Sequence, residues 1–141
     1  MENVIIGLGS NLGERRGYLA QARDEIEKHV GHIVLVSSII ETESWGFQSH
    51  PFMNQVIVIR TDLEPIALLD QLQSIERKMG RTEKTSIHEG KPVYHDRTID
   101  LDILDYNHLQ WHDERLTLPH PEIKNREFVQ ESLRELNINL P

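Results

Sequence analysis

The stretch Arg97-Thr98-Ile99-Asp100-Leu101-Asp102-Ile103-Leu104 has the alternation of apolar and polar residues that is typical of a β-strand. Its apolar residues at 99, 101 and 103 would point to one face, where they need a core to pack against. Asp100 and Asp102 would point together to the other face, and two carboxylates this close repel each other unless a cation or a proton lies between them. A hard cation such as Mg²⁺ takes one or two protein carboxylates and leaves its other positions to water and phosphate. The pair therefore indicates a metal site, with a solvated strand face that discourages edge pairing as the alternative.

Length and composition limit the class of protein. At 141 residues the chain is long enough for one domain with a substantial core, and we expect a single domain over 1–141. The absence of cysteine excludes disulfides, thiolate metal sites and thiol nucleophiles. No stretch is apolar enough to span a membrane, and the first residues lack the basic-then-apolar order of a signal peptide. We therefore expect a soluble cytoplasmic protein.

The charge is uneven along the chain. The net charge of -8 argues against a general nucleic-acid binder, which needs clustered positive charge. The segment 77–97, however, holds six basic and three acidic residues and is net +3. Beside a carboxylate pair, such a segment suits a small polyanion that is bound with a metal. An ordinary solvated run of charges is the alternative.

Hydrophobic periodicity divides the rest of the chain into strands and helices. The first helix would begin with Asn11 as its N-cap and Glu14 as the reciprocal capping residue. The expected elements are strands over 4–9, 32–42, 52–61 and 97–104, helices over 11–30 and 64–79, an extended segment over 115–121 and a short helix near 128–136. This order predicts an α+β, ferredoxin-like split βαβ fold: a mainly antiparallel sheet with helices packed on it, plus a short C-terminal helix. Such a fold hosts many functions, so function has to come from the site.

Several segments carry signals for ligand binding, each with a structural alternative. Gly7 and Gly9 would let backbone amides approach a phosphate, or would only form a tight turn. The aromatic residues of 45–52 with Asn54 would form a slot for a flat heterocycle, in which Asn54 offers both a donor and an acceptor, or would cover the end of the core. Gln73 and Glu76 share a helix face, where such residues are usually solvated. The polar, non-periodic stretch 81–96 is predicted to be a loop, either a lid or disordered.

Three motifs are specific when they are taken together. They are Gly9-Ser10-Asn11, the strand 97–103, and Arg115-Leu116-Thr117-Leu118-Pro119-His120-Pro121 followed by Asn125-Arg126 and Phe128. In this order and spacing they resemble the hydroxymethyl-dihydropterin pyrophosphokinase (HPPK) family of folate biosynthesis. The resemblance implies an enzyme that transfers diphosphate from ATP to the hydroxymethyl group of 6-hydroxymethyl-7,8-dihydropterin and releases AMP. We expect a monomer with these two small-molecule substrates and with no nucleic-acid or membrane partner.

The same resemblance implies roles for individual residues. Asp100 and Asp102 would hold two Mg²⁺ ions that bridge the ATP phosphates, and Asp102 would help to deprotonate the pterin hydroxyl. The residues implied in catalysis are Asp102, Arg97, Arg81 and His120. The residues implied in ATP binding are Gln73, Glu76, Arg97, Ile103, Arg115, Thr117 and His120. The residues implied in pterin binding are Thr42, Trp45, Phe52, Asn54, Asp100 and Phe128.

The chain departs from the family pattern in the stretch 81–96. Glu83 stands where a second loop arginine is common, and Tyr94-His95-Asp96 replaces the usual Trp-Gly-Pro. Charge closure by this loop is therefore expected to be weaker or to use Lys84.

Two other functions fit part of the pattern. A nucleotidyltransferase also uses a Gly-Ser turn and an Asp-x-Asp strand, but there the two motifs lie close together, whereas Ser10 and Asp100 are far apart in this sequence. A ferredoxin-like binding module without activity would leave the aspartates merely solvated. An assay with Mg-ATP and the pterin separates these alternatives from a pyrophosphokinase.

Overall fold

The computed structural model describes residues 1–43, 51–80, 85–88, 91–94 and 98–140, with the backbone alone for 85–88 and 91–94. The elements in chain order are β1 (Glu2–Ser10), α1 (Arg15–His29), β2 (His32–Val36), β3 (Ile40–Thr42), β4 (Phe52–Thr61), α2 (Pro65–Lys78), β5 (Thr85–His88), β6 (Lys91–Tyr94), β7 (Asp100–Tyr106), β8 (Trp111–His112), β9 (Thr117–Leu118), the 3₁₀ helix η1 (Ile123–Asn125) and α3 (Glu127–Glu135). None of the helices in these ranges combines the length and the apolar character that crossing a bilayer requires.

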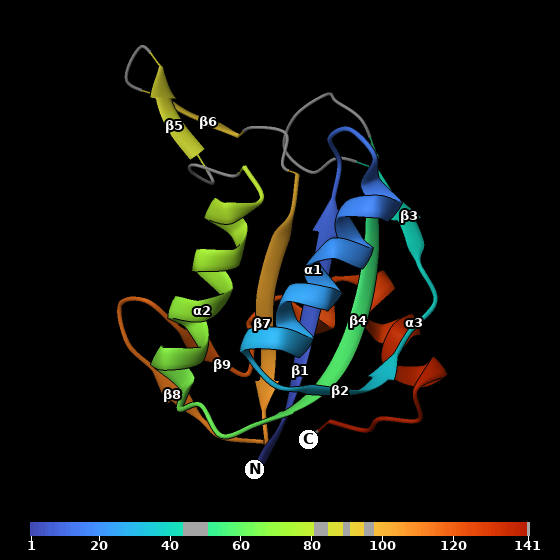
Figure 1. The fold of residues 1–141 in the computed structure, drawn as a ribbon, viewed down its shortest axis with the longest axis vertical. Helices are drawn as coiled ribbons and strands as arrows, with labels where there is room; N and C mark the ends of the chain where they lie inside the picture. The colour runs from blue at the N-terminus through green and yellow to red at the C-terminus, as the bar shows by residue number, and fades with distance from the viewer. Residues whose placement is uncertain (44–50, 81–84, 89–90, 95–97, 141) are drawn as a thin grey trace.

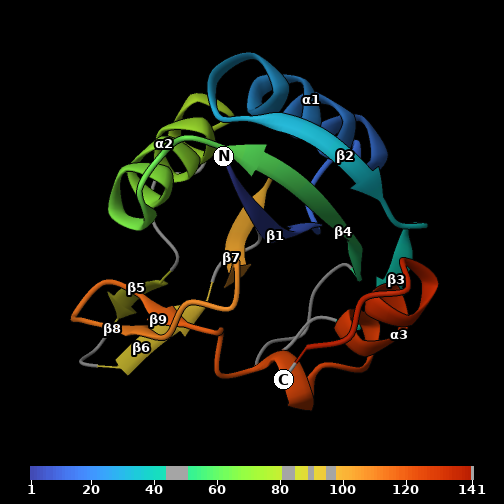
Figure 2. The same cartoon turned by 90° about the horizontal axis from the view of Figure 1, so that it is seen from below.

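The main sheet has five strands in the order β2-β4-β1-β7, with β3 also paired to β4 (Figure 1). Strand β1 lies antiparallel to both β4 and β7, and β2 and β3 lie antiparallel to β4. Helices α1 and α2 cover one face of the sheet, whereas α3 lies on the other (Figure 2). This arrangement confirms the predicted ferredoxin-like fold.

The two faces of the sheet carry separate apolar clusters. Inward residues of the strands, such as Ile6, Ile57 and Leu101, form the larger cluster with the apolar stripes of α1 and α2. The opposite residues, such as Ile5 and Val58, form a smaller cluster with η1 and α3. Each fully buried aliphatic side chain contributes about 1.5–3 kcal/mol. Helix α3 lies beside β3 and β4 and away from β7 (Figures 1 and 2).

Strand β7 confirms the predicted alternation. Ile99, Leu101 and Ile103 are all buried in the larger cluster. A β-bulge then shifts the register, because Ile6 pairs with Ile103 and Ile5 pairs with Asp105. Leu104 packs in the smaller cluster, as the alternation requires, whereas beyond the bulge Tyr106 lies in the larger cluster again.

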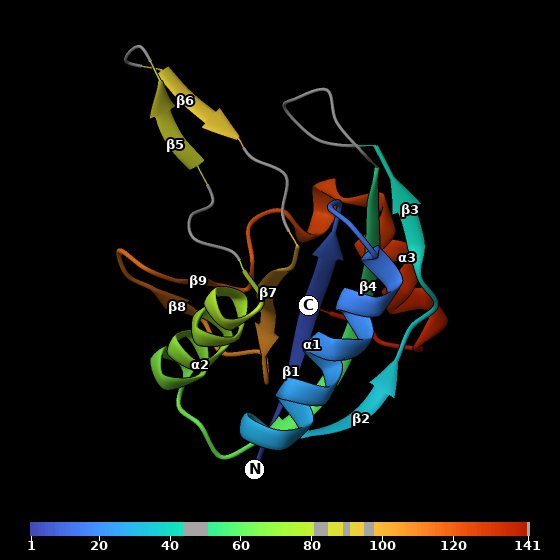
Figure 3. The ribbon, with the colours of Figure 1, turned by 45° about the horizontal axis from the view of Figure 1, so that its top comes forward.

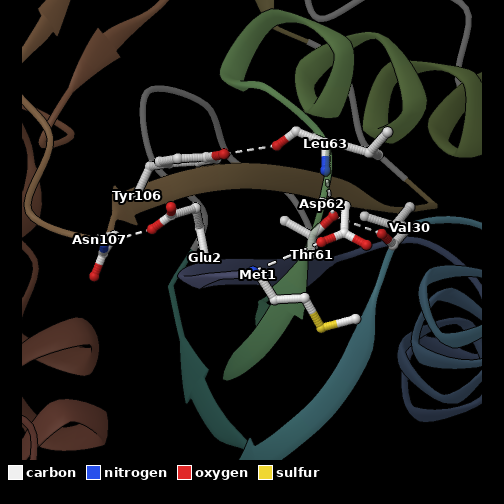
Figure 4. A network of polar contacts seen from close by, with 8 residues as sticks. All are labelled: Met1, Glu2, Val30, Thr61, Asp62, Leu63, Tyr106 and Asn107. Atoms are coloured by element: carbon white, nitrogen blue, oxygen red, sulfur yellow. Dashed lines mark hydrogen bonds and ion pairs between the residues drawn. The ribbon is translucent and has the colours of Figure 1, made fainter.

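Hydrogen bonds tie the strand ends together at the end of the sheet that lies away from Asp100 (Figure 4). The Tyr106 hydroxyl donates to the Leu63 carbonyl at 2.7 Å, and the Thr61 hydroxyl donates to the Val30 carbonyl at 2.7 Å. The Asn107 amide donates to the Glu2 carboxylate. Burial, and then the nearby carboxylates, raise the pKa of Tyr106, so this hydroxyl stays a donor. The bonds of Tyr106 and Asn107 hold the end of β7 in place.

Two predictions near the N-terminal half were wrong. The predicted strand 32–42 is two strands, because the Ser37 side chain interrupts the ladder: the Val56 N–H donates to the Ser37 hydroxyl at 2.9 Å. Asn11 does not cap α1, which begins at Arg15 after the positive-φ residue Gly13 turns the chain. Asn11 is instead fully buried.

The prediction that the stretch 81–96 is a loop was wrong for part of it. Its described parts, β5 and β6, form a separate antiparallel pair in which Thr85 is opposite Tyr94. Figure 3 shows this pair projecting from the end of the molecule at which β7 begins. The predicted extended segment 115–121 is a strand only at β9, and the chain turns at Pro121. The prediction failed because a proline restricts the backbone of the residue before it and does not keep the residues after it extended.

Candidate active site

Asp100 and Asp102 lie on one face of β7, as predicted, and their neighbours in β1 are both glycines. Gly9 pairs with Asp100 and Gly7 pairs with Asp102, so no β1 side chain stands beside the carboxylates. The Asp102 side chain is 17% exposed, and its Oδ2 lies 3.5 Å from Nη1 of Arg126. Among the residues whose side chains are described, no group of three or more His, Cys, Asp or Glu side chains is placed to hold a metal ion. Within the part of the chain that the structure describes, the pair is therefore the candidate metal site.

Glu76 links helix α2 to the strand that carries the aspartates. Its Oε2 accepts the backbone N–H of Leu101 at 2.8 Å, and the residue is only 5% exposed. Leu101 lies between Asp100 and Asp102, so this bond fixes the strand at the centre of the pair. The solvated alternative considered for Glu76 is therefore wrong.

A cleft of about 290 Å³ lies between α2, β7 and the segment that runs from β8 to Pro121. All described residues that were implied in ATP binding line it, although they come from three separate parts of the chain. These are Gln73, Glu76, Ile103, Arg115, Thr117 and His120. Asp102 lines the same cleft. Folding thus brings the predicted nucleotide residues together beside one carboxylate of the pair.

Arg115 enters the cleft from a loop that Asp113 holds. The Asp113 Oδ1 accepts the backbone N–H groups of Arg115 at 2.8 Å and of Leu116 at 2.9 Å. The hydrogen bond from the Arg115 N–H, and to a smaller extent the one from the Trp111 indole N–H, lowers the pKa of the Asp113 carboxyl. Asp113 is therefore charged at neutral pH. The guanidinium Nη2 of Arg115 donates to Asp70 Oδ1 at 2.6 Å and to Gln73 Oε1 at 3.1 Å.

His120 is oriented by its own turn. Its backbone N–H donates to the Leu104 carbonyl at 2.8 Å, and its Nδ1 accepts the Glu122 N–H at 3.1 Å. Because Nδ1 accepts, the proton of a neutral ring lies on Nε2. His120 can therefore present a donor to an anion in the cleft.

Residues implied in pterin binding gather at the other side of Gly9. The Asn54 Nδ2 donates to Thr42 Oγ1 at 2.7 Å and to the Ile40 carbonyl at 3.1 Å. Both amide hydrogens are thus used, which corrects the expectation that Asn54 offers a donor: it can offer a ligand only its oxygen. A Cβ at Gly9 would lie 3.3 Å from Asn54 Oδ1 and 3.4 Å from Phe52 Cδ1. Phe128 lies at the start of α3 against the smaller cluster.

Comparison with known proteins decides the family. The sequence profile of the 7,8-dihydro-6-hydroxymethylpterin-pyrophosphokinase (HPPK) family matches residues 5–138. The chain belongs to the HPPK family. This confirms the resemblance found in the sequence.

Two bacterial HPPK relatives are similar over almost the whole chain. The 2-amino-4-hydroxy-6-hydroxymethyldihydropteridine pyrophosphokinase of Porphyromonas gingivalis is 41% identical over 138 residues, which cover 96% of this chain and 91% of the relative. The protein of the same name from Bacillus subtilis is 39% identical over 139 residues, covering 96% of this chain and 79% of the relative.

Solved HPPK-DHPS structures share the fold. One, in complex with substrates, has a TM-score of 0.70 at 17% identity, and one from Plasmodium falciparum, with SDX-DHP, has a TM-score of 0.69 at 14% identity. Each match covers 96% of this chain, whereas the chain spans about 40% of the length of those proteins. At this identity the match bears on the fold alone.

Three residues expected in the HPPK site, Trp45, Arg81 and Arg97, lie outside the described residues. One residue was missed: Arg126, whose guanidinium contacts Asp102. Arg126 was part of a motif that was used for the resemblance, but no role was given to it. The sequence offered one signal for this role: Arg126 is a basic residue close to Phe128, and the two aspartates need a counter-charge.

Proposed function

We propose that this chain transfers the diphosphate group of ATP to the hydroxymethyl oxygen of 6-hydroxymethyl-7,8-dihydropterin in folate biosynthesis, giving AMP and the pterin diphosphate. One observation carries the proposal. Asp102 lines the cleft that is also lined by the residues implied in ATP binding, and Asp100 pairs with Gly9, against which Asn54 and Phe52 lie. A triphosphate in the cleft and a ring beside Gly9 would therefore meet at the two carboxylates.

The donor set at this meeting point fits magnesium. Two carboxylates with glycine neighbours leave room for an ion that also takes phosphate oxygens and water. Among the described residues, the cleft is lined by four carboxylates, on Glu76, Asp102, Asp113 and Glu114, and by one guanidinium, on Arg115. A polyanion would be repelled there without added cations. We therefore propose that Asp100 and Asp102 hold two Mg²⁺ ions, which would neutralise the charge that develops on the transferred group.

The protein's own groups supply positioning. The hydroxymethyl oxygen would attack the β-phosphorus of ATP. The bond between the β-phosphorus and the α,β-bridging oxygen would break, and AMP would leave with that oxygen. Asp102 is proposed to help to deprotonate the hydroxymethyl oxygen, and Arg115 and His120 are proposed to bind phosphate oxygens. Glu76 keeps β7 in place through the Leu101 N–H.

The pterin would be recognised by its edge and by its two faces. Asn54 presents a fixed carbonyl oxygen, which suits a donor on the edge of the ring. Phe52 and Phe128 are proposed to stack on the ring. Arg97 and Arg81 are proposed to contact phosphate and to close the site, and Trp45 is proposed to contact the pterin.

The setting of the enzyme is also a proposal. We propose that it acts in the cytoplasm as a monomer and without nucleic-acid or membrane partners. The net charge of -8 supports the lack of a nucleic-acid partner, because phosphate-backbone binding depends on clustered positive charge.

An assay of nucleotide products tests the function. With Mg-ATP and the dihydropterin, AMP should form in step with pterin diphosphate, and only when the pterin is present. Pyrophosphate release with a nucleotidylated acceptor would instead indicate a nucleotidyltransferase. Tight binding of both ligands without products would indicate a binding module.

A further inference from the structure

A carboxylate outside the cleft holds the one guanidinium that the described residues place in the cleft lining. Asp70 Oδ1 accepts from Nη2 of Arg115 at 2.6 Å. The same Nη2 lies 3.1 Å from Gln73 Oε1, so the guanidinium is held by two side chains on one turn of α2. Gln73 and Arg115 line the cleft, whereas Asp70 is not among its lining residues and has a side chain that is 57% exposed.

A guanidinium recognises carboxylate and phosphate with the same donors. When the Arg115 guanidinium donates to Asp70, its Nη2 is used by a carboxylate outside the cleft and is less available to a phosphate. Asp70 also adds a negative charge near a cleft whose described lining residues already carry four carboxylates. Both effects oppose a polyphosphate that approaches Arg115.

We propose that Asp70 is an internal competitor for Arg115: the guanidinium leaves the Asp70 carboxylate for a phosphate oxygen when nucleotide enters, and returns to it when the product leaves. The inference rests on the proposed function, because it takes Arg115 as a phosphate ligand. Asp70 then acts through Arg115 as a positioning residue that lowers nucleotide affinity and favours release. The exchange is feasible because both partners are partly exposed, and exposed ion pairs are weak.

The substitution Asp70→Asn tests the proposal. Calorimetric titration with a non-hydrolysable ATP analogue and Mg²⁺ should show about two- to fivefold tighter binding, the range that an exposed ion pair allows. The substitution Glu114→Gln is the matched control. Like Asp70→Asn, it removes one carboxylate charge, in this case from the cleft lining itself, and the structure records no bond between Glu114 and the Arg115 guanidinium. Glu114→Gln should tighten binding less than Asp70→Asn does. Weaker binding by Asp70→Asn would overturn the proposal, because Asp70 would then be needed to place Arg115.

A double-mutant cycle separates competition from general charge. In an Arg115→Gln background, Asp70→Asn should tighten binding no more than Glu114→Gln does. An unchanged gain in that background would overturn the proposal. Turnover with the pterin is measured separately: if analogue binding follows the expected pattern but no pterin-dependent AMP forms, the proposed function fails and the competition stands. If the unsubstituted chain does not bind the analogue, both fail.

Discussion

The Glu76 carboxylate accepts the backbone N–H of Leu101 at 2.8 Å, so α2 is bonded to β7 at the residue between Asp100 and Asp102. Glu76→Ala would leave this buried N–H without its acceptor, at a cost of about 1–3 kcal/mol in the free energy of unfolding. Turnover should fall as well, because the aspartates lose their support. Glu76→Gln is the control, since its amide oxygen can still accept. Urea unfolding and the AMP assay check both variants, and equal stability of the two would contradict this role.

Substitutions in the pair Asp100 and Asp102 should lower turnover without lowering the melting temperature. Asp100→Asn relieves the repulsion within the pair, so the melting temperature without metal should stay the same or rise, whereas Asp102→Asn also removes the ion pair with Arg126 and should leave the melting temperature nearly unchanged. Turnover should fall by about 100-fold or more if these groups hold the catalytic ions. Asp24→Asn, an exposed change on α1, is the control and should alter neither property. Near-normal turnover of either pair variant in Mg²⁺ would rule out the metal assignment.

The space above Gly9 should determine pterin affinity. An added Cβ at Gly9 would lie 3.3 Å from Asn54 Oδ1 and 3.4 Å from Phe52, so Gly9→Ala must displace groups that are proposed to bind the ring. Gly7→Ala is the matched control, because the atoms nearest to its Cβ belong to the Leu104 side chain, at 3.4 Å and beyond, and not to a residue that is proposed to bind the ring. Calorimetry should show weaker pterin binding for Gly9→Ala, with nucleotide binding changed less. The idea fails if the two variants bind the pterin equally well.

Two buried serines should respond in opposite ways to substitution by alanine. Among the described residues, the Ser132 hydroxyl is buried without a hydrogen-bond partner, so Ser132→Ala should be neutral or stabilise the protein by up to about 1 kcal/mol. The Ser37 hydroxyl accepts the Val56 N–H at 2.9 Å, so Ser37→Ala should cost about 1–3 kcal/mol. Denaturant unfolding of the two variants checks this. A large loss of stability in Ser132→Ala would point to a partner for its hydroxyl.

The parts of the fold that could be predicted from the sequence were those with a clear period. The alternation of residues 99–103 and the apolar stripe of α2 correspond to burial in the structure. Features that depend on one local bond were missed. The Ser37 hydroxyl ends a strand whose pattern continues to Thr42, and the positive φ of Gly13 separates Asn11 from α1. The β5–β6 pair was missed because its sequence is polar and lacks a period.

The site was predictable only as a set of residue types. The residues implied in ATP binding could be named from the family resemblance, but their shared cleft and the acceptance of the Leu101 N–H by Glu76 depend on packing between distant segments. The contact of Arg126 with Asp102 and the use of both Asn54 amide hydrogens are likewise tertiary facts. No period or spacing in the sequence encodes them.

A crystal structure with Mn²⁺, a non-hydrolysable ATP analogue and the dihydropterin tests the central claim most directly. Anomalous signal should place metal ions on the carboxylates of Asp100 and Asp102, with the triphosphate in the cleft beside Arg115 and the ring beside Gly9. Metal-free aspartates, with the nucleotide bound elsewhere on the protein, would contradict the account.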